Sequence, residues 1–163
     1  MQRICDEGGC AMINLANRRS ILLSQHQRLR DLIETLRQAA GSVLTSRDEA
    51  LEQRAAWLAG AIGSFGAELN AHLATEEDLL GPVLERVDAW GPLRLELMRV
   101  EHAHQRAVLD ALRTDRKLHA RDMAKRAWSL TIDVLADMEA EERDLLAENV
   151  LRDDPVVLNQ SER

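Results

Sequence analysis

Apolar residues recur at intervals of three and four along most of this chain, the spacing that places them on one face of an α-helix. Four segments show the pattern, at about 14–41, 48–80, 92–117 and 121–150. Gly81-Pro82 is expected to end or kink the second helix, because proline removes a backbone hydrogen bond, and residues 82–90 then form a connector. Asp153-Asp154-Pro155 is expected to stop the last helix.

Four long amphipathic helices joined by short connections predict one all-α domain, an up-down-up-down four-helix bundle. We expect the bundle to span residues 14–152, with a flexible N-terminal tail at 1–13 and a C-terminal tail at 153–163. Gly60, Gly63 and Gly66 weaken the second helix, and they either allow a close approach of another helix or mark a bend.

Ionisable residues interrupt these apolar stripes at a few places. His26 lies between Leu22 and Leu29, and His72 and Glu76 follow the stripe of the second helix. Residues four apart on a helix point in nearly the same direction, so His72 and Glu76 form a clamp. Burying such groups is costly unless they are paired or bind a metal ion.

An internal repeat links the two halves of the chain. Arg follows four residues after His26 and again four residues after His102, and apolar positions then match. The segment from His72 also matches the segment from Met138, with the same Ala, Glu, Asp, Leu and Leu. Two copies of a helical hairpin would therefore bring one set of side chains together: His26, His72, Glu76, His102 and Glu142.

Imidazole and carboxylate groups are the ligands that iron and zinc prefer, so this set predicts a metal site. Mutual hydrogen bonding between His and Glu is the alternative that needs no metal. His104 points about 200° away from His102 and is expected at the surface, and His119 is expected in a solvated turn.

Composition narrows the functional classes. Ala, Leu, Glu and Arg favour helix, and the net charge of -7 arises from interleaved acids and bases, so we expect neither nucleic-acid nor membrane binding. No apolar run reaches the length of a membrane span, and the first residues lack a signal-peptide core, so a cytoplasmic location is expected. Cys5 and Cys10 are expected as exposed thiols in the N-terminal tail.

From about residue 20 to 150, the chain resembles the hemerythrin-like family of HHE cation-binding four-helix bundles. The resemblance implies two non-heme irons held by one His from helix 1, a His-x-x-x-Glu from helix 2, a His from helix 3 and a His-x-x-x-Glu from helix 4. The matching positions here are His26, His72, Glu76, His102 and Glu142, while Met138 stands where the helix 4 His is expected.

A thioether is a poor ligand for iron, so Met138 leaves three alternatives open. Water, Glu139 or Glu141 replaces the sixth ligand; one iron is lost; or the bundle holds little metal. Met138→His is expected to raise the amount of bound iron. The resemblance also implies that oxygen carriers have a second His on helix 3, where this chain has Arg106, which argues against oxygen carriage.

The leading hypothesis is a protein with two irons, or one, that binds, senses or reacts with dioxygen, peroxide or nitric oxide. The alternatives are a structural or regulatory bundle with a degenerate, metal-free site, and a zinc protein. The sequence does not identify a protein partner.

Overall fold

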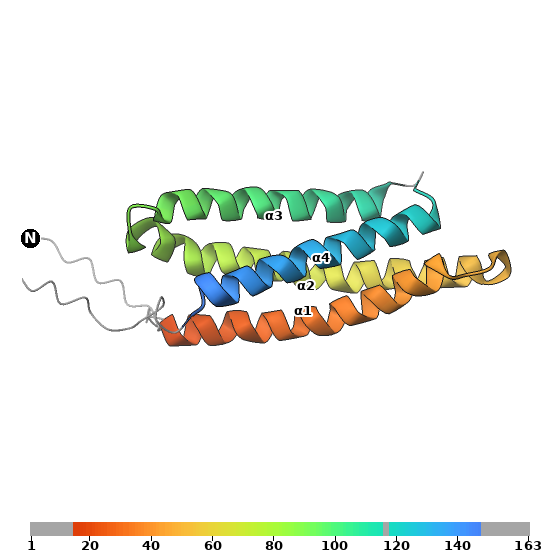
Figure 1. The fold of residues 1–163 in the computed structure, drawn as a ribbon, viewed down its shortest axis with the longest axis horizontal. Helices are drawn as coiled ribbons and strands as arrows, with labels where there is room; N and C mark the ends of the chain where they lie inside the picture. The colour runs from red at the N-terminus through yellow and green to blue at the C-terminus, as the bar shows by residue number, and fades with distance from the viewer. Residues whose placement is uncertain (1–14, 116–117, 148–163) are drawn as a thin grey trace, which may run out of the picture.

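The computed structural model describes residues 15–115 and 118–147, and these form an antiparallel bundle of four long helices (Figure 1). The helices are α1 (Leu15–Leu44), α2 (Leu51–Val87), α3 (Gly91–Thr114) and α4 (Ala120–Asp144). A short 3-10 helix, η1 (Asp48–Ala50), precedes α2. The predicted all-α four-helix bundle is confirmed; the two tails predicted at 1–13 and 153–163, with Cys5 and Cys10, lie outside the described residues.

The expectation that Gly81-Pro82 ends the second helix is wrong. α2 continues through Pro82 for more than one further turn. Leu80 and Leu84, on either side of the proline, are both buried in one apolar cluster, so the burial offsets the lost backbone bond. Near the proline, Arg18 Nη1 of α1 donates a hydrogen bond to Leu79 O at 3.0 Å and ties α2 to α1 there.

The last helix is shorter than the periodicity predicts. α4 ends at Asp144, and Leu146 then turns into an apolar cluster, where its carbonyl accepts a hydrogen bond from Arg19 Nε at 2.6 Å. His119 stands immediately before α4, and both it and His104 are exposed.

One of the four glycines of α2 allows a close helix contact. A Cβ placed on Gly66 would lie 2.7 Å from Leu109 Cδ1 of α3, closer than carbon atoms tolerate. A Cβ on Gly60 or Gly63 would have no neighbour within 4 Å. Among Gly60, Gly63 and Gly66, only Gly66 is therefore explained by the close approach of another helix.

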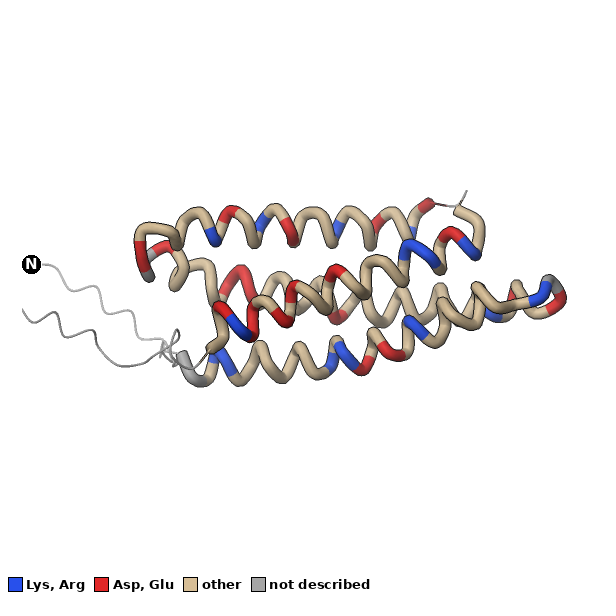
Figure 2. Tube along the Cα trace, viewed as in Figure 1, with Lys and Arg blue, Asp and Glu red and all other residues tan. Residues whose placement is uncertain are grey.

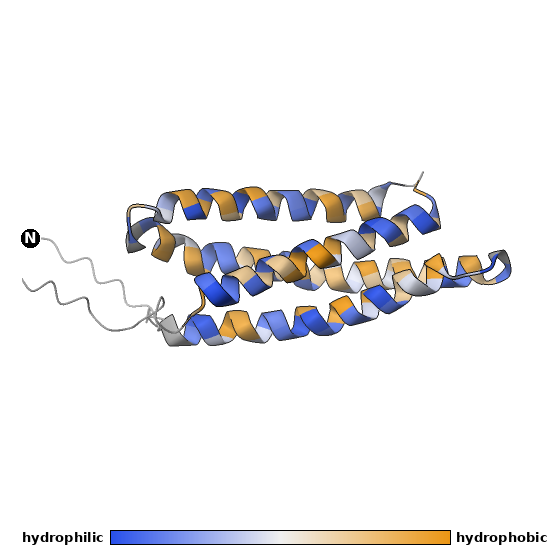
Figure 3. Ribbon diagram, viewed as in Figure 1, coloured by the Kyte–Doolittle hydropathy of each residue, from blue (hydrophilic) through white to orange (hydrophobic). Residues whose placement is uncertain are grey.

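The buried side chains form two apolar clusters, one towards each end of the bundle. Hydrophobic and hydrophilic residues alternate along each helix, as the amphipathic pattern requires (Figure 3). The larger cluster includes Leu29, Phe65 and Met138, and the smaller includes Leu22 and Leu80. Within the described ranges, every helix is too short or too polar to cross a membrane.

The helices do not pack equally. α1 packs extensively on α2 and α4, and α2 also packs on α3, whereas α3 and α4 make far fewer contacts with each other. The seam between α3 and α4 is therefore the open side of the bundle.

Candidate metal centre

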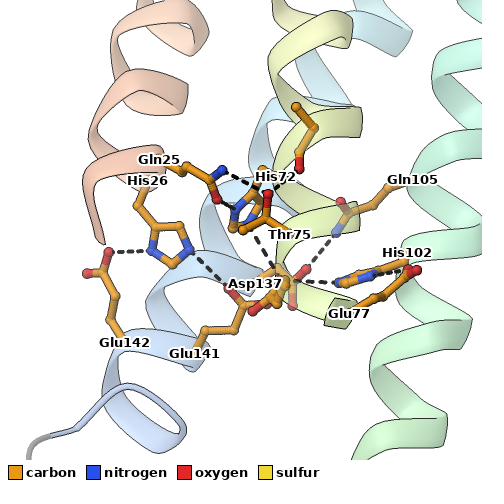
Figure 4. Close-up of polar contacts among 12 residues, drawn as sticks. Gln25, His26, His72, Thr75, Glu77, His102, Gln105, Asp137, Glu141 and Glu142 are labelled. Atoms are coloured by element: carbon orange, nitrogen blue, oxygen red, sulfur yellow. Dashed lines mark hydrogen bonds and ion pairs between the residues drawn. The ribbon is translucent and has the colours of Figure 1, made fainter. Parts of the chain in front are cut away.

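A layer of buried polar side chains separates the two apolar clusters. On α1, α2 and α3 it lies between a residue of the larger cluster and a residue of the smaller one, such as Leu29 and Leu22 on α1. At α4 it lies between Met138 and Leu146, which follows the end of the helix. At most 6% of each of these residues is exposed to solvent: His26, His72, Glu76, His102 and Glu141. All four helices contribute (Figure 4).

These side chains approach one another through their inner atoms. His26 Nε2 lies 3.2 Å from Glu141 Oε2, and Glu76 Oε2 lies 3.5 Å from His72 Nε2 and 3.3 Å from His102 Nε2. Two groups result, His26–His72–Glu141 and Glu76–His102–Glu141, and within each group the candidate ligand atoms lie within 4.8 Å of one another. Glu141 belongs to both groups.

The inner atoms lack hydrogen-bond partners. Among the described residues, no hydrogen bond of acceptable geometry reaches His26 Nε2, His102 Nε2, Glu141 Oε2 or either carboxylate oxygen of Glu76. An unsatisfied buried polar atom costs about 1–3 kcal/mol. Five such atoms aimed at one small volume are the donor set that a divalent cation would satisfy, so these residues fit a metal ion.

The outer nitrogens of His26 and His102 are satisfied by matching pairs of residues. His26 Nδ1 donates to Glu142 Oε1 at 2.8 Å, and Arg30 Nη2 donates to the same oxygen at 2.8 Å. His102 Nδ1 donates to Glu77 Oε1 at 2.8 Å, and Arg106 Nη1 donates there at 2.7 Å. A carboxylate accepts only, so each Nδ1 carries the proton and each Nε2 offers a lone pair inward.

His72 has a neutral partner instead. Its Nδ1 donates to Gln25 Oε1 at 3.2 Å, and Gln25 Nε2 donates to Thr75 Oγ1 at 3.1 Å. Burial, together with the nearby His26, lowers the pKa of His72 to about 4. The His72 imidazole is therefore neutral near pH 7, as a metal ligand must be.

Neighbouring carboxylates raise the pKa values of His26 and His102. Burial lowers the pKa of His26, but the carboxylate of Glu141, 3.2 Å from Nε2, and the hydrogen bond from Nδ1 to Glu142 raise it more, so the net pKa is raised. The pKa of His102 is raised in the same way against burial by Glu76 and Glu77. Metal binding at His26 and His102 would therefore compete with protonation of their imidazoles.

Glu142 does not lie where the repeat places it. Its carboxylate is partly exposed and bonds the outer nitrogen of His26, while its neighbour Glu141 faces the interior. Since Glu77 and Glu142 make equivalent contacts, Glu141 corresponds to Glu76. The sequence comparison of the second and fourth helices was therefore out of register by one residue.

The one-residue shift in register also removes Met138 from the position that corresponds to His72. It is 1% exposed and packs in the larger apolar cluster. The residue one turn before Glu141, matching His72, is Asp137, whose Oδ2 accepts from Gln105 Nε2 at 2.6 Å. Burial, with the nearby Glu141 charge, raises the pKa of Asp137 to about 6. In this register the residue that corresponds to His72 carries a carboxylate and not a thioether, although Asp137 belongs to neither of the two candidate metal groups of the described residues.

The structure brings together four of the five predicted residues: His26, His72, Glu76 and His102. Sequence reasoning treated Glu141 only as a substitute ligand and missed Glu77 and Asp137. The repeated Glu-Glu doublets, at 76–77 and 141–142, were the feature able to reveal the correct register.

A four-helix bundle with buried histidines and carboxylates at its centre belongs to the class of helical metal-binding proteins. A family model described as the hemerythrin HHE cation-binding domain matches residues 18–148, and the chain belongs to that family. Neither a curated protein nor a solved structure matches it.

Proposed function

We propose that this chain is a non-heme iron protein, with one or two irons, that binds or reacts with a small oxidant such as dioxygen, peroxide or nitric oxide. The observation that carries the proposal is the set of unpartnered inner atoms on His26, His102, Glu76 and Glu141. Mixed imidazole and carboxylate donors suit iron, and the family is a cation-binding one.

The proposed ligands fall into two positions that share a carboxylate. His26 and His72 would hold one ion and His102 and Glu76 the other, with Glu141 placed to reach both. Bound ferrous iron would supply electrons and an open coordination position to the oxidant. Asp137, one turn from Glu141, is an additional oxygen donor near the second position.

The chain's own residues would prepare the site for that chemistry. Glu142 and Glu77 fix the imidazole tautomers of His26 and His102. The two apolar clusters keep bulk water from reaching the layer along the bundle axis, which strengthens the electrostatic interactions within it. Arg106 donates to Glu77, the carboxylate that orients His102, and is not a metal ligand. Because oxygen carriers of the family are expected to have a second ligand His at this position, Arg106 favours sensing or turnover of the oxidant over oxygen carriage.

Metal analysis tests the proposal directly. Protein purified under low oxygen should contain one to two irons per chain and should gain a ligand-to-iron absorption band on oxidation. His72→Ala should remove most of the iron, because it deletes a buried ligand, whereas His104→Ala, a histidine at the surface, should leave it unchanged.

A colourless protein without metal would favour the structural bundle, and stoichiometric zinc in place of iron would favour a zinc protein. Either result would exclude the proposed oxidant chemistry.

A further inference from the structure

The open seam between α3 and α4 contains two adjoining cavities of about 690 and 620 Å³. Glu101 of α3 and Asp137 and Ala140 of α4 line both of them. Since the two helices contact each other sparsely, the cavities lead from the surface between them. This is the side of the bundle where least protein covers the polar layer.

The cavity walls include buried polar atoms that make no hydrogen bond with the described residues. Glu141 lines the larger cavity, is 6% exposed, and its Oε2 accepts no hydrogen bond from the described residues. Gln105 lines the smaller one, is 4% exposed, and its Oε1 is likewise unpartnered among them. Glu141 also belongs to both candidate metal groups, so the larger cavity ends at the proposed centre.

The lining of the larger cavity is strongly acidic. It carries five carboxylates, from Asp88, Glu101, Asp137, Glu141 and Asp144. Arg94, its single cationic side chain, is already paired with Asp88 at 3.1 Å. Figure 2 shows acidic positions along α3 and in the C-terminal half of α4. Such a lining attracts cations and repels anions.

The outer sides of His26 and His102 differ from this seam. Arg30 covers the carboxylate behind His26, and Arg106 covers the one behind His102. A cation approaching along either of those paths would meet an arginine first.

We propose that divalent cations enter the centre through the seam between α3 and α4, with Glu101 attracting the ion at the mouth and Asp137 passing it to Glu141. The inference rests on the proposed metal centre, though not on iron as the metal. Glu101 is exposed and lines both cavities, and Asp137 lies four residues before Glu141 on the same helix. The three carboxylates thus lead from solvent to the buried layer.

The rate of metal uptake tests the route separately from binding. Metal-free protein is mixed with Co²⁺ in a stopped-flow instrument, and the visible absorption of bound cobalt reports both rate and final stoichiometry. Glu101→Gln should slow uptake about threefold and Glu101→Lys about tenfold at low ionic strength, with unchanged stoichiometry. Both differences should shrink at high salt, because salt screens the attraction.

Two further variants complete the design. Glu96→Lys changes an exposed glutamate on the same helix that lines neither cavity, so it should leave the rate close to that of the unmodified chain. Ala140→Phe places a bulky side chain in both cavities and should slow uptake at every salt concentration.

Full stoichiometry with unchanged rates in Glu101→Lys and Ala140→Phe would overturn the entry route and leave the metal centre intact. Equal slowing by Glu96→Lys would also overturn it, since net charge alone would then explain the effect. Absence of cobalt uptake by the unmodified chain would overturn both the route and the centre.

Discussion

Each imidazole of the centre is oriented by a bond on the nitrogen that faces away from it. For His26 and His102 the partner is a carboxylate, itself paired with an arginine. Burial raises the pKa of Glu142, but its bonds to His26 and Arg30 outweigh burial, so the carboxylate stays charged. Such outer partners typically change metal affinity 10- to 100-fold.

This arrangement predicts different results for two adjacent glutamates. Glu142→Gln should weaken metal binding by about 10- to 100-fold, because the metal ligand loses only its support. Glu141→Gln should weaken it more, since it removes a donor shared by both groups. Affinity measured by competition with a chromophoric chelator distinguishes the two, with the exposed Glu139→Gln as control. A larger loss of affinity with Glu142→Gln would indicate that Glu142, and not Glu141, is the metal ligand, as the sequence repeat predicts.

Asp137 predicts a pH-dependent stability of the metal-free protein. Its folded pKa of about 6 lies above the usual 3.8, so the charged form is disfavoured by folding. The resulting destabilisation is present above pH 6 and disappears as the pH falls below 4. Asp137→Asn should therefore stabilise the metal-free protein by about 2 kcal/mol at pH 7.5 and have little effect near pH 4. Urea unfolding with a chelator present measures this, and a pH-independent difference would contradict it.

In α2, the burial of apolar side chains outweighs the local tendency of proline to end a helix. Proline in a helix interior usually ends the helix, yet α2 passes through Pro82 because Leu80 and Leu84 are both needed in the smaller cluster. That outcome depends on contacts with other helices, among them Leu22 of α1 and Leu95 of α3. A pattern confined to residues 78–86 does not contain this information.

The glycines of α2 predict opposite mutational effects. Gly66→Ala should destabilise the fold by about 1 kcal/mol, because the overlap with the buried Leu109 exceeds the gain in helix propensity. Gly63→Ala, with open space around its Cβ, should stabilise the fold by about 0.5–1 kcal/mol. Urea midpoints of the two variants measure the difference, and equal shifts would show that α2 and α3 do not approach closely at Gly66.

At the scale of the whole molecule, the polar layer between the two apolar clusters lowers the stability of the metal-free protein, because several of its buried atoms make no hydrogen bond with the described residues. A ligand that binds only the folded state stabilises it by about 2.7 kcal/mol at 100 times its dissociation constant. A divalent metal should therefore raise the thermal midpoint of the metal-free protein, and a chelator should reverse the change. His72→Ala should lower the midpoint and reduce its response to both metal and chelator, because it removes a ligand of one of the two groups. A midpoint of the unmodified chain that ignores metal would argue against the centre.

The sequence predicted the four-helix bundle and most of the layer, though not where the second and fourth helices end, and the reason lies in helix geometry. His26, His72 and Glu76 each occupy a position where the stripe requires an apolar residue, so periodicity finds them, and the internal repeat selects His102. On α4 the adjacent Glu141 and Glu142 differ by only about 100° around the axis. Their roles were settled by contacts across the bundle, with His26 and Arg30, which a single helix does not reveal.

The sparse seam beside α3 also has a kinetic consequence. α3 is held chiefly by α2, and it carries His102 but no residue of the His26–His72–Glu141 group. Transient separation of α3 would dismantle one half of the layer and leave the other assembled. Two ions bound there would exchange with solution at unequal rates, the one beside His102 leaving first.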